Sequence, residues 1–260
     1  MLSAARHSLL KWRIFKPHPA CITGRSFCTS SHCFLHINHV NKPQMTQHVW
    51  KPADHIPERV QALIRSQQPI NSMLAFTQIL RLLKTQPRTG WVDKGIPVAK
   101  VESISDHMYR MSLIAMALPA EEVSIDKCVK IALVHDIAES LVGDITPFGG
   151  VTKAEKHRRE EETIDYLVAL IEGYSPRFAR EMKELWLAYE NILCPEARYV
   201  KDIDKFEMIA QAWDYEQDYG IQYDLSEFYK SRNGIETKIV GDLCDELVKQ
   251  RTAYIESLQQ

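Results

Sequence analysis

The stretch Ala132-Leu133-Val134-His135-Asp136-Ile137-Ala138-Glu139 places a histidine and two carboxylates at the end of an apolar run. On an α-helix, Glu139 lies four residues after His135 and three after Asp136, so the three side chains share one face. Burying such groups costs free energy unless a partner compensates them. A divalent cation suits imidazole and carboxylate together. The stretch therefore predicts a helix that forms one wall of a metal site.

Helical spacing of apolar residues continues on both sides of this stretch. Ser105, Asp126 and Thr152 are the expected N-caps, and Glu155 completes a capping box with Thr152. The predicted helices cover 71–84, 105–118, 126–143, 152–172, 176–191, 196–217 and 235–258. The alternation typical of strands is missing from the sequence. We therefore expect an all-α fold of six to eight helices.

Charge divides the chain into two parts. Residues 1–53 contain seven of the 32 Lys and Arg residues and no carboxylate. From Asp54 onward the chain therefore has 25 basic and 34 acidic residues, a clear negative excess. An acidic domain is a poor partner for nucleic-acid polymers. No run approaches the roughly 18 apolar residues of a membrane helix. We expect a basic extension over 1–53 and one folded domain over 54–260, with neither a nucleic-acid polymer nor a membrane as partner.

The basic extension has two interpretations. Residues 1–13 have the composition of a basic amphipathic helix, and residues 25–31 resemble a cleavage context, as in a mitochondrial transit peptide. Alternatively, the extension is a disordered tail, or lies upstream of initiation at Met45. The six cysteines include no CxxC pair, which indicates reduced thiols inside the cell. Location in the cytoplasm or in the mitochondrial matrix stays open.

Further metal ligands must come from other helices. Beyond His55 the chain has only two other histidines, and we favour His107 over His157, which lies in a charged run expected to face solvent. For a distal carboxylate we favour Asp204, which lies on or near the apolar face of its helix, and we expect Asp202 to face water. Asp144 follows Gly143, where the central helix is expected to end, and brings a further carboxylate close to Glu139.

The order His107, His135-Asp136, Asp204 resembles the H…HD…D signature of HD-domain phosphohydrolases. Longer runs are similar to the eukaryotic HD-domain 5'-deoxynucleotidases, and the resemblance spans residues 71–255. These runs cover 87–91, 103–111, 132–139, 142–145 and 155–162. The resemblance implies a helical HD domain that forms a homodimer. It also implies metal-dependent hydrolysis of deoxyribonucleoside 5'-monophosphates to deoxyribonucleosides and phosphate.

Residue roles follow from the same resemblance. The first ion would be Mn, Co, Mg or a similar divalent metal, held by His107, His135, Asp136 and Asp204. A second ion, making two per subunit, would be held by Glu139, Asp144 and the carbonyl of Ile145. In bacterial relatives the residue matching Glu139 has an acid/base role instead, so Glu139 and Asp144 are also the candidate catalytic residues.

Two residues are candidates for substrate binding. The guanidinium of Arg88 suits a phosphate, and Trp91 would pack on the sugar and exclude a 2'-hydroxyl. The matching Arg and Trp are adjacent in bacterial relatives, whereas Thr89 and Gly90 separate them here. Two other functions stay open. One is another HD activity, such as hydrolysis of cyclic nucleotides or nucleoside triphosphates, and the other is a non-catalytic metal- or nucleotide-binding regulatory module.

Overall fold

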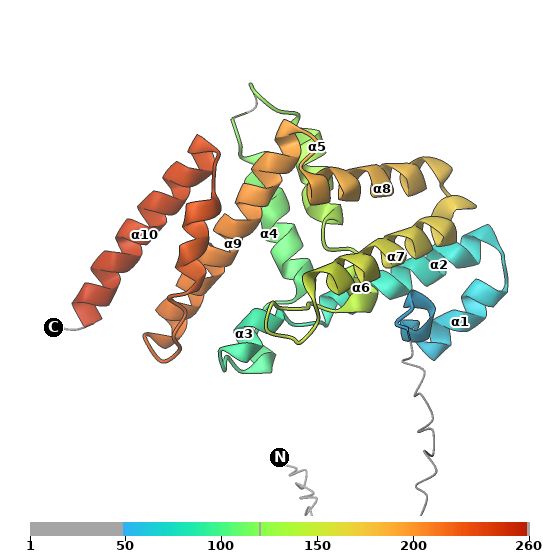
Figure 1. Cartoon of the computed structure of the whole chain (residues 1–260), viewed down its shortest axis with the longest axis horizontal. Helices are drawn as coiled ribbons and strands as arrows, with labels where there is room; N and C mark the ends of the chain where they lie inside the picture. Colours follow the sequence, from blue (N-terminus) through green and yellow to red (C-terminus); the bar gives the residue numbers. More distant parts are fainter. Residues whose placement is uncertain (1–48, 120, 259–260) are drawn as a thin grey trace, which may run out of the picture. The chain divides into compact units, whose positions relative to one another are not determined.

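The computed structural model describes residues 49–119 and 121–258, and these form ten α-helices and four short 3-10 helices without a strand (Figure 1). The α-helices are α1 (Glu58–Arg65), α2 (Pro69–Leu80), α3 (Thr89–Asp93), α4 (Ile104–Met116), α5 (Ile125–Val134), α6 (Glu139–Val142), α7 (Lys153–Glu172), α8 (Pro176–Asn191), α9 (Pro195–Tyr219) and α10 (Lys238–Leu258). The 3-10 helices are η1 (Pro52–His55), η2 (Arg81–Lys84), η3 (Val98–Lys100) and η4 (Phe228–Gly234).

The core lies where α4, α5 and α9 pack against one another, near the middle of Figure 1. Fully buried side chains from all three helices meet there, including Ile104, Met111, Ile131, Ile203 and Ile209. Helix α7 packs on α2 and α8, and α8 in turn contacts α5. The all-α prediction is confirmed. The number of helices in the described residues is ten rather than six to eight, because α1 and α3 lie outside the predicted segments and α6 is separate from α5.

The predicted helix over 126–143 is wrong as a continuous element. Helix α5 ends at Val134, His135 occupies its C-cap, and α6 begins only at Glu139. Between them the amides of Ile137 and Glu139 each donate to the carbonyl three residues earlier, not four residues earlier as in an α-helix. Both bonds are 3.0 Å long. This tighter winding turns the backbone at His135-Asp136. Gly143 then ends α6 with a φ of 79°, a conformation that glycine adopts without strain.

Two of the three predicted N-caps are displaced by two residues. Ser103, not Ser105, caps α4. Its side chain accepts from the amide of Asp106, and the Asp106 carboxylate accepts from the Ser103 amide, which completes a capping box. Ser124, not Asp126, caps α5. Thr152 caps α7 as predicted. In both corrected cases a serine lies closer to the helix start and satisfies the free amide three residues later.

Most of the basic extension, residues 1–48, lies outside the described residues, and so does the predicted transit peptide. From Trp50 onward the chain packs on the domain, because Arg159 of α7 lies over the Trp50 ring, 5.7 Å from its centroid, and Pro52 is buried. Among the described residues, none of the helices has the length and apolar character needed to cross a bilayer.

Candidate metal centre

The turn after α5 places the side chains of His135 and Asp136 close together. Nδ1 of His135 lies 2.8 Å from the carbonyl oxygen of Ala132. A carbonyl only accepts hydrogen bonds, so Nδ1 carries the proton and Nε2 presents a lone pair. That Nε2 lies 3.1 Å from Oδ2 of Asp136 and has no hydrogen-bond partner, although His135 is buried. Two groups that only accept therefore face each other, which suits a cation between them.

His107 is oriented in the same way by a carboxylate behind it. Glu207 of α9 is fully buried and forms a short hydrogen bond with Nδ1 of His107. Arg110 holds Glu207 in place, with 2.8 Å between its Nε and Glu207 Oε1. Nε2 of His107 then faces Asp204, 3.3 Å from its Oδ1, and Asp136, 3.9 Å from its Oδ2. A carboxylate behind a histidine fixes the ring orientation in metal sites.

Asp204 reaches this point from α9 and is held by a tyrosine. The hydroxyl of Tyr189, from α8, donates to Oδ2 of Asp204 at 2.6 Å. Burial would raise the pKa of Asp204, but His107 holds it well below the usual range. Burial would also raise the pKa of Asp136, but the cationic side chains beside it, including Arg88, hold it below its usual range. Both carboxylates are therefore ionised at neutral pH.

The ligand atoms of His107, His135 and Asp136 lie within 4.8 Å of one another, and Asp204 lies beside them. Burial and Arg88 lower the pKa of His107, but Glu207 and Asp204 raise it to about 10. A group of carboxylates that holds a proton on an imidazole so firmly is a strong cation site. The donor set of two imidazoles and two carboxylates fits a divalent transition metal.

Glu139, Asp144 and the Ile145 carbonyl lie at the other end of the same pocket. Glu139 is 2 % exposed, and its Oε2 has no hydrogen-bond partner. Burial raises the pKa of Glu139, and Asp136 and Asp144 raise it further. The ammonium of Lys156 lies 3.3 Å from both Oε1 of Glu139 and the oxygen of Ile145. This lysine therefore contacts two of the three groups expected to hold a second ion.

Asp144 is positioned by α3, just after Arg88. The amide of Thr89 donates to Oδ2 of Asp144 at 2.6 Å, and the Thr89 hydroxyl donates to its carbonyl at 2.7 Å. Nη1 of Arg88 lies 3.3 Å from Oδ2 of Asp136 and 4.0 Å from Oε2 of Glu139. Arg88 thus bridges the two ends of the carboxylate cluster.

Trp91 follows on α3 and is almost fully buried, at 2 % exposure. Its Nε1 donates to Oε1 of Glu102 at 2.8 Å. Its ring packs on Phe228, with centroids 4.3 Å apart, and on Tyr215. Trp91 forms part of the pocket wall from this fixed position.

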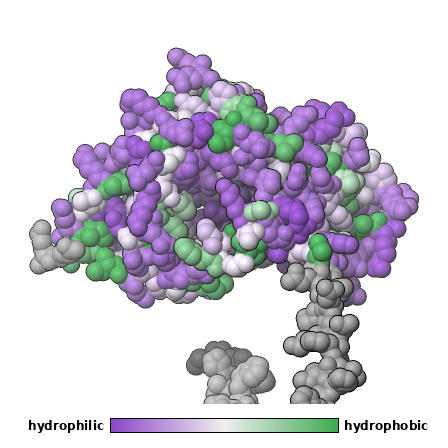
Figure 2. Space-filling view, viewed as in Figure 1, coloured by the Kyte–Doolittle hydropathy of each residue, from purple (hydrophilic) through white to green (hydrophobic). Residues whose placement is uncertain are grey.

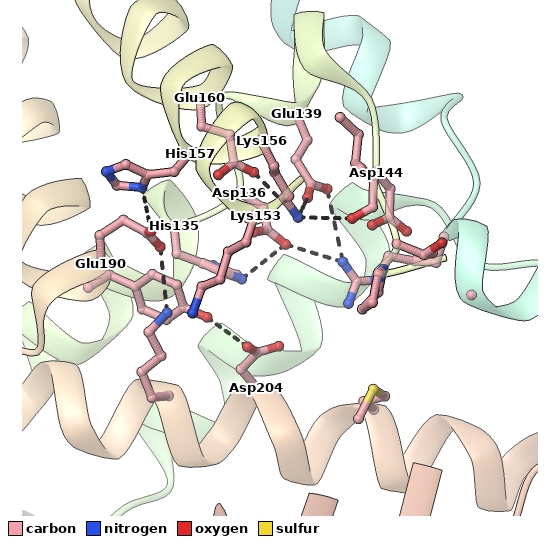
Figure 3. A pocket seen from close by; sticks show the side chains of 18 of the residues that line it. His135, Asp136, Glu139, Asp144, Lys153, Lys156, His157, Glu160, Glu190 and Asp204 are labelled. Atoms are coloured by element: carbon pink, nitrogen blue, oxygen red, sulfur yellow. Dashed lines mark hydrogen bonds and ion pairs between the residues drawn. The ribbon is translucent and has the colours of Figure 1, made fainter. Parts of the chain in front are cut away.

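All the predicted site residues except His107 line one pocket of about 450 Å³ (Figure 3), and His107 is fully buried. Hydrophilic residues dominate the face of the molecule seen in Figure 2. Four cationic side chains of the pocket lining oppose six carboxylates. The cations are Arg88, Lys153, Lys156 and Lys201, and the carboxylates are Asp136, Glu139, Asp144, Glu160, Glu190 and Asp204. The excess of carboxylates suits bound cations.

One expectation about a neighbouring residue is wrong. Asp202 is fully buried instead of facing water, because its Oδ2 accepts from the amides of Glu236 and Thr237 at 2.9 and 2.7 Å. The charged run of α7 leaves His157 exposed to solvent as expected, and Lys156, His157 and Glu160 also line the pocket. Arg158 of the same run makes the expected ion pairs along the helix, with Glu155 and Glu162.

The sequence reasoning missed Glu207, Arg110, Lys156 and Tyr189. Glu207 lies three residues after Asp204 on one helix, inside the apolar run 206–209, and this spacing places it on the same face. That spacing was the available signal for Glu207. Lys156 and Tyr189 depend on how α7 and α8 pack, which no local pattern encodes.

The helical fold and this His–Asp cluster define a candidate metal centre of the kind found in HD domains. The family model described as "HD domain" matches residues 80–243. The chain belongs to the HD domain family.

The chain is also similar to curated and solved proteins. It is 50 % identical to the 5'-deoxynucleotidase YGK1 of Saccharomyces cerevisiae over 82 % of this chain and 98 % of that protein. It is 41 % identical to the human 5'-deoxynucleotidase HDDC2 over 71 % of this chain and 88 % of that protein. A solved structure of the HD domain-containing protein YGK1 superposes with a TM-score of 0.61, covering 79 % of this chain and 98 % of that one at 42 % identity.

Proposed function

We propose that this protein is a metal-dependent 5'-deoxynucleotidase, which hydrolyses deoxyribonucleoside 5'-monophosphates to deoxyribonucleosides and phosphate. The observation that carries the proposal is the pair of unpartnered imidazole nitrogens, Nε2 of His107 and Nε2 of His135, directed at Asp136 and Asp204. The curated relatives named as 5'-deoxynucleotidases support the same reaction.

We propose that His107, His135, Asp136 and Asp204 hold the first ion. A divalent ion at this position offsets charge on the phosphoryl oxygens and lowers the pKa of a bound water. Glu207 and Tyr189 keep two of these ligands in orientation. Glu139, whose pKa is raised by burial, is suited to take or give a proton.

Arg88 is the proposed phosphate-binding residue. Its guanidinium is 17 % exposed and already lies beside Asp136 and Glu139, so a phosphate bound at the first ion would lie within its reach. Trp91 is the proposed sugar-contacting residue. Because Glu102 fixes the indole, the wall that it forms is rigid, and a rigid wall can exclude a 2'-hydroxyl.

The direct test is phosphate release from paired substrates, dAMP with AMP and dGMP with GMP, with Mn²⁺, Co²⁺, Mg²⁺ or Zn²⁺ added in turn to metal-stripped protein. We expect release from the deoxy member of each pair to be far faster. Chelation should abolish it, and His135→Ala should lose both the ion and the activity. His157→Ala is the matched control, because this third histidine lines the pocket outside the proposed ligand set, and it should retain the ion.

Each other outcome identifies a different function. Equal turnover of AMP and dAMP would remove the deoxy specificity. Cleavage of cyclic nucleotides or nucleoside triphosphates, followed by product chromatography, would indicate another HD activity. Tight nucleotide binding with no turnover under any metal would indicate a regulatory module.

We also propose two ions per subunit, the second held by Glu139, Asp144 and the Ile145 carbonyl. The pocket lining supports this number, because Glu139, Asp144 and Ile145 line it in addition to the ligands proposed for the first ion. Elemental analysis of the metal-loaded protein tests the stoichiometry and the metal identity.

A homodimer is proposed as the assembly. Exposed apolar side chains of α4 and α5 support it, namely Tyr109, Leu113, Met116 and Leu133. Light scattering after size-exclusion chromatography measures the mass. Met116→Glu should dissociate a dimer built on this face.

We further propose that residues 1–53 are a basic extension, whose last residues pack on the domain, and that 54–260 are the HD domain. Mass spectrometry of the mature N-terminus distinguishes a cleaved transit peptide from a retained tail.

A further inference from the structure

A second cavity, of about 660 Å³, adjoins the pocket of the candidate metal centre. The two cavities share part of their lining, namely Gly90, Asp144, Ile145, Thr146, Pro147 and Phe228. Because the same residues line both, the two cavities lie side by side, with the metal ligands in the first and residues of the loop 143–151 in the second.

The outer cavity is lined by an aromatic side chain with no partner of its own. Phe148 is 82 % exposed, the highest exposure among the large hydrophobic residues of the described chain. It lies between Gly143 and Gly150, which have φ values of 79° and 74°. Phe228 lines the same cavity and is backed by Trp91, at 4.3 Å between ring centroids. An exposed aromatic side chain at a cavity is suited to stack on a flat apolar ring.

Polar groups of the outer cavity already have partners. Lys94 contacts Glu227 at 3.0 Å, and the hydroxyl of Thr146 donates to Asp93 at 3.2 Å. Arg159 is held by Glu155 at 2.8 Å. Groups that already have partners gain little by bonding to a particular ring edge. The cavity therefore offers aromatic stacking without strong selection among rings.

The shape of a 5'-nucleotide matches the arrangement of the two cavities. Its phosphate and base lie at opposite ends of the sugar. A ligand with phosphate at the metal ligands and sugar beside Gly90 and Phe228 would extend its base into the outer cavity. We propose that this cavity is the nucleobase subsite and that Phe148 stacks on the base of the substrate. This proposal rests on the proposed function and adds the residue that recognises the base.

The test compares Phe148→Ala with wild-type protein on two ligands, dGMP and the base-free 2-deoxyribose 5-phosphate. Stacking of one base on an aromatic side chain corresponds to roughly a tenfold effect or more when that side chain is truncated. We expect the ratio of kcat/KM for dGMP over 2-deoxyribose 5-phosphate to fall about tenfold in Phe148→Ala, mainly through KM. Phe148→Trp should keep the wild-type ratio, and dCMP should lose less than dGMP because its ring is smaller. Tyr174→Ala is the matched control, since it removes an aromatic side chain that is 48 % exposed and lies outside both cavities.

Equal losses on the two ligands would overturn the proposal, because they would show that Phe148 only shapes the loop. An unchanged ratio would also overturn it. If wild-type protein releases phosphate from no deoxynucleotide, the proposed function fails instead. Calorimetric binding of dGMP and 2-deoxyribose 5-phosphate then still tests the subsite, because Phe148→Ala must weaken dGMP selectively.

Discussion

Glu207 lies directly behind His107, bonded to its Nδ1 within the core, and so determines that Nε2 faces Asp204 and Asp136. Neither group is exposed to solvent, and Arg110 from α4 compensates the charge of Glu207. The two helices that carry the distal ligands, α4 and α9, are thus joined at the site by a charged hydrogen bond rather than by apolar packing alone. The orientation of a proposed ligand therefore depends on a residue that does not face the pocket.

Glu207→Gln should weaken metal binding without unfolding the protein. The amide cannot accept a hydrogen bond as strongly as a carboxylate, so the ring loses basicity and orientation. Loss of such a partner typically costs 10- to 100-fold in metal affinity. Titration of metal-stripped protein with Mn²⁺, followed by calorimetry, measures the change. Asp214→Asn is the control, since Asp214 holds the opposite side of Arg110 but is half exposed, and its effect should be several-fold smaller. An unchanged affinity in Glu207→Gln would contradict the assigned role.

Asp202→Ala and Asp204→Ala should have opposite consequences although the residues are two positions apart. Asp202 accepts from two amides just before α10, and buried amides left without an acceptor cost about 1–3 kcal/mol each. We expect Asp202→Ala to lower the free energy of unfolding by about 2–4 kcal/mol and to retain the metal. Asp204→Ala should lose the metal, because it removes one of the four proposed ligands. Urea unfolding and metal titration on both variants separate the two roles, and metal loss in Asp202→Ala would contradict them.

These two aspartates show which parts of the site the sequence predicts. The apolar stripe of 196–217 was enough to favour Asp204 as the inward residue. The same stripe predicts that Asp202 faces water, because the pattern describes one helix without its neighbours. The amides that bury Asp202 belong to residues 236 and 237, which follow η4, and their approach is a property of the tertiary fold.

The helix break at His135-Asp136 was unpredictable for a similar reason. Apolar spacing continues from α5 through Leu141, so periodicity favours one helix. The turn between α5 and α6 has helical dihedral angles at its ends and differs only in hydrogen-bond register. Side chains separated by three or four residues stay close together both in a continuous helix and in this turn. The predicted cluster of His135, Asp136 and Glu139 therefore forms although the helix is interrupted.

Lys156→Met should raise the affinity for a second ion. The Lys156 ammonium lies 3.3 Å from both Glu139 Oε1 and the Ile145 oxygen, so it competes with a cation for the same two oxygen atoms. Removing it leaves Glu139 buried without this compensation, and a metal then gains what the lysine supplied. Equilibrium dialysis with Mg²⁺ or Mn²⁺ should show tighter binding of a second equivalent. Lys153→Met is the matched control, because Lys153 lines the same pocket. Identical stoichiometry and affinity in wild-type and Lys156→Met protein would exclude the competition.

The stability difference between Glu102→Gln and wild-type protein should depend on pH. Burial raises the pKa of Glu102 to about 7, and the nearby Glu207 contributes to the increase. Since the ordinary value is 4.5, the folded protein binds this proton more tightly than the unfolded chain does. Protonation therefore stabilises the fold fully below about pH 4.5, and the stabilisation is lost as pH rises towards 7. Glutamine stays neutral, and its side-chain oxygen still accepts from Nε1 of Trp91. We expect the two proteins to be equally stable at pH 5 and the variant to be more stable at pH 8, by up to about 3 kcal/mol. Urea unfolding of both proteins at pH 5, 6, 7 and 8 measures the difference. A difference that stays constant over this range would mean that Glu102 is already ionised at pH 5.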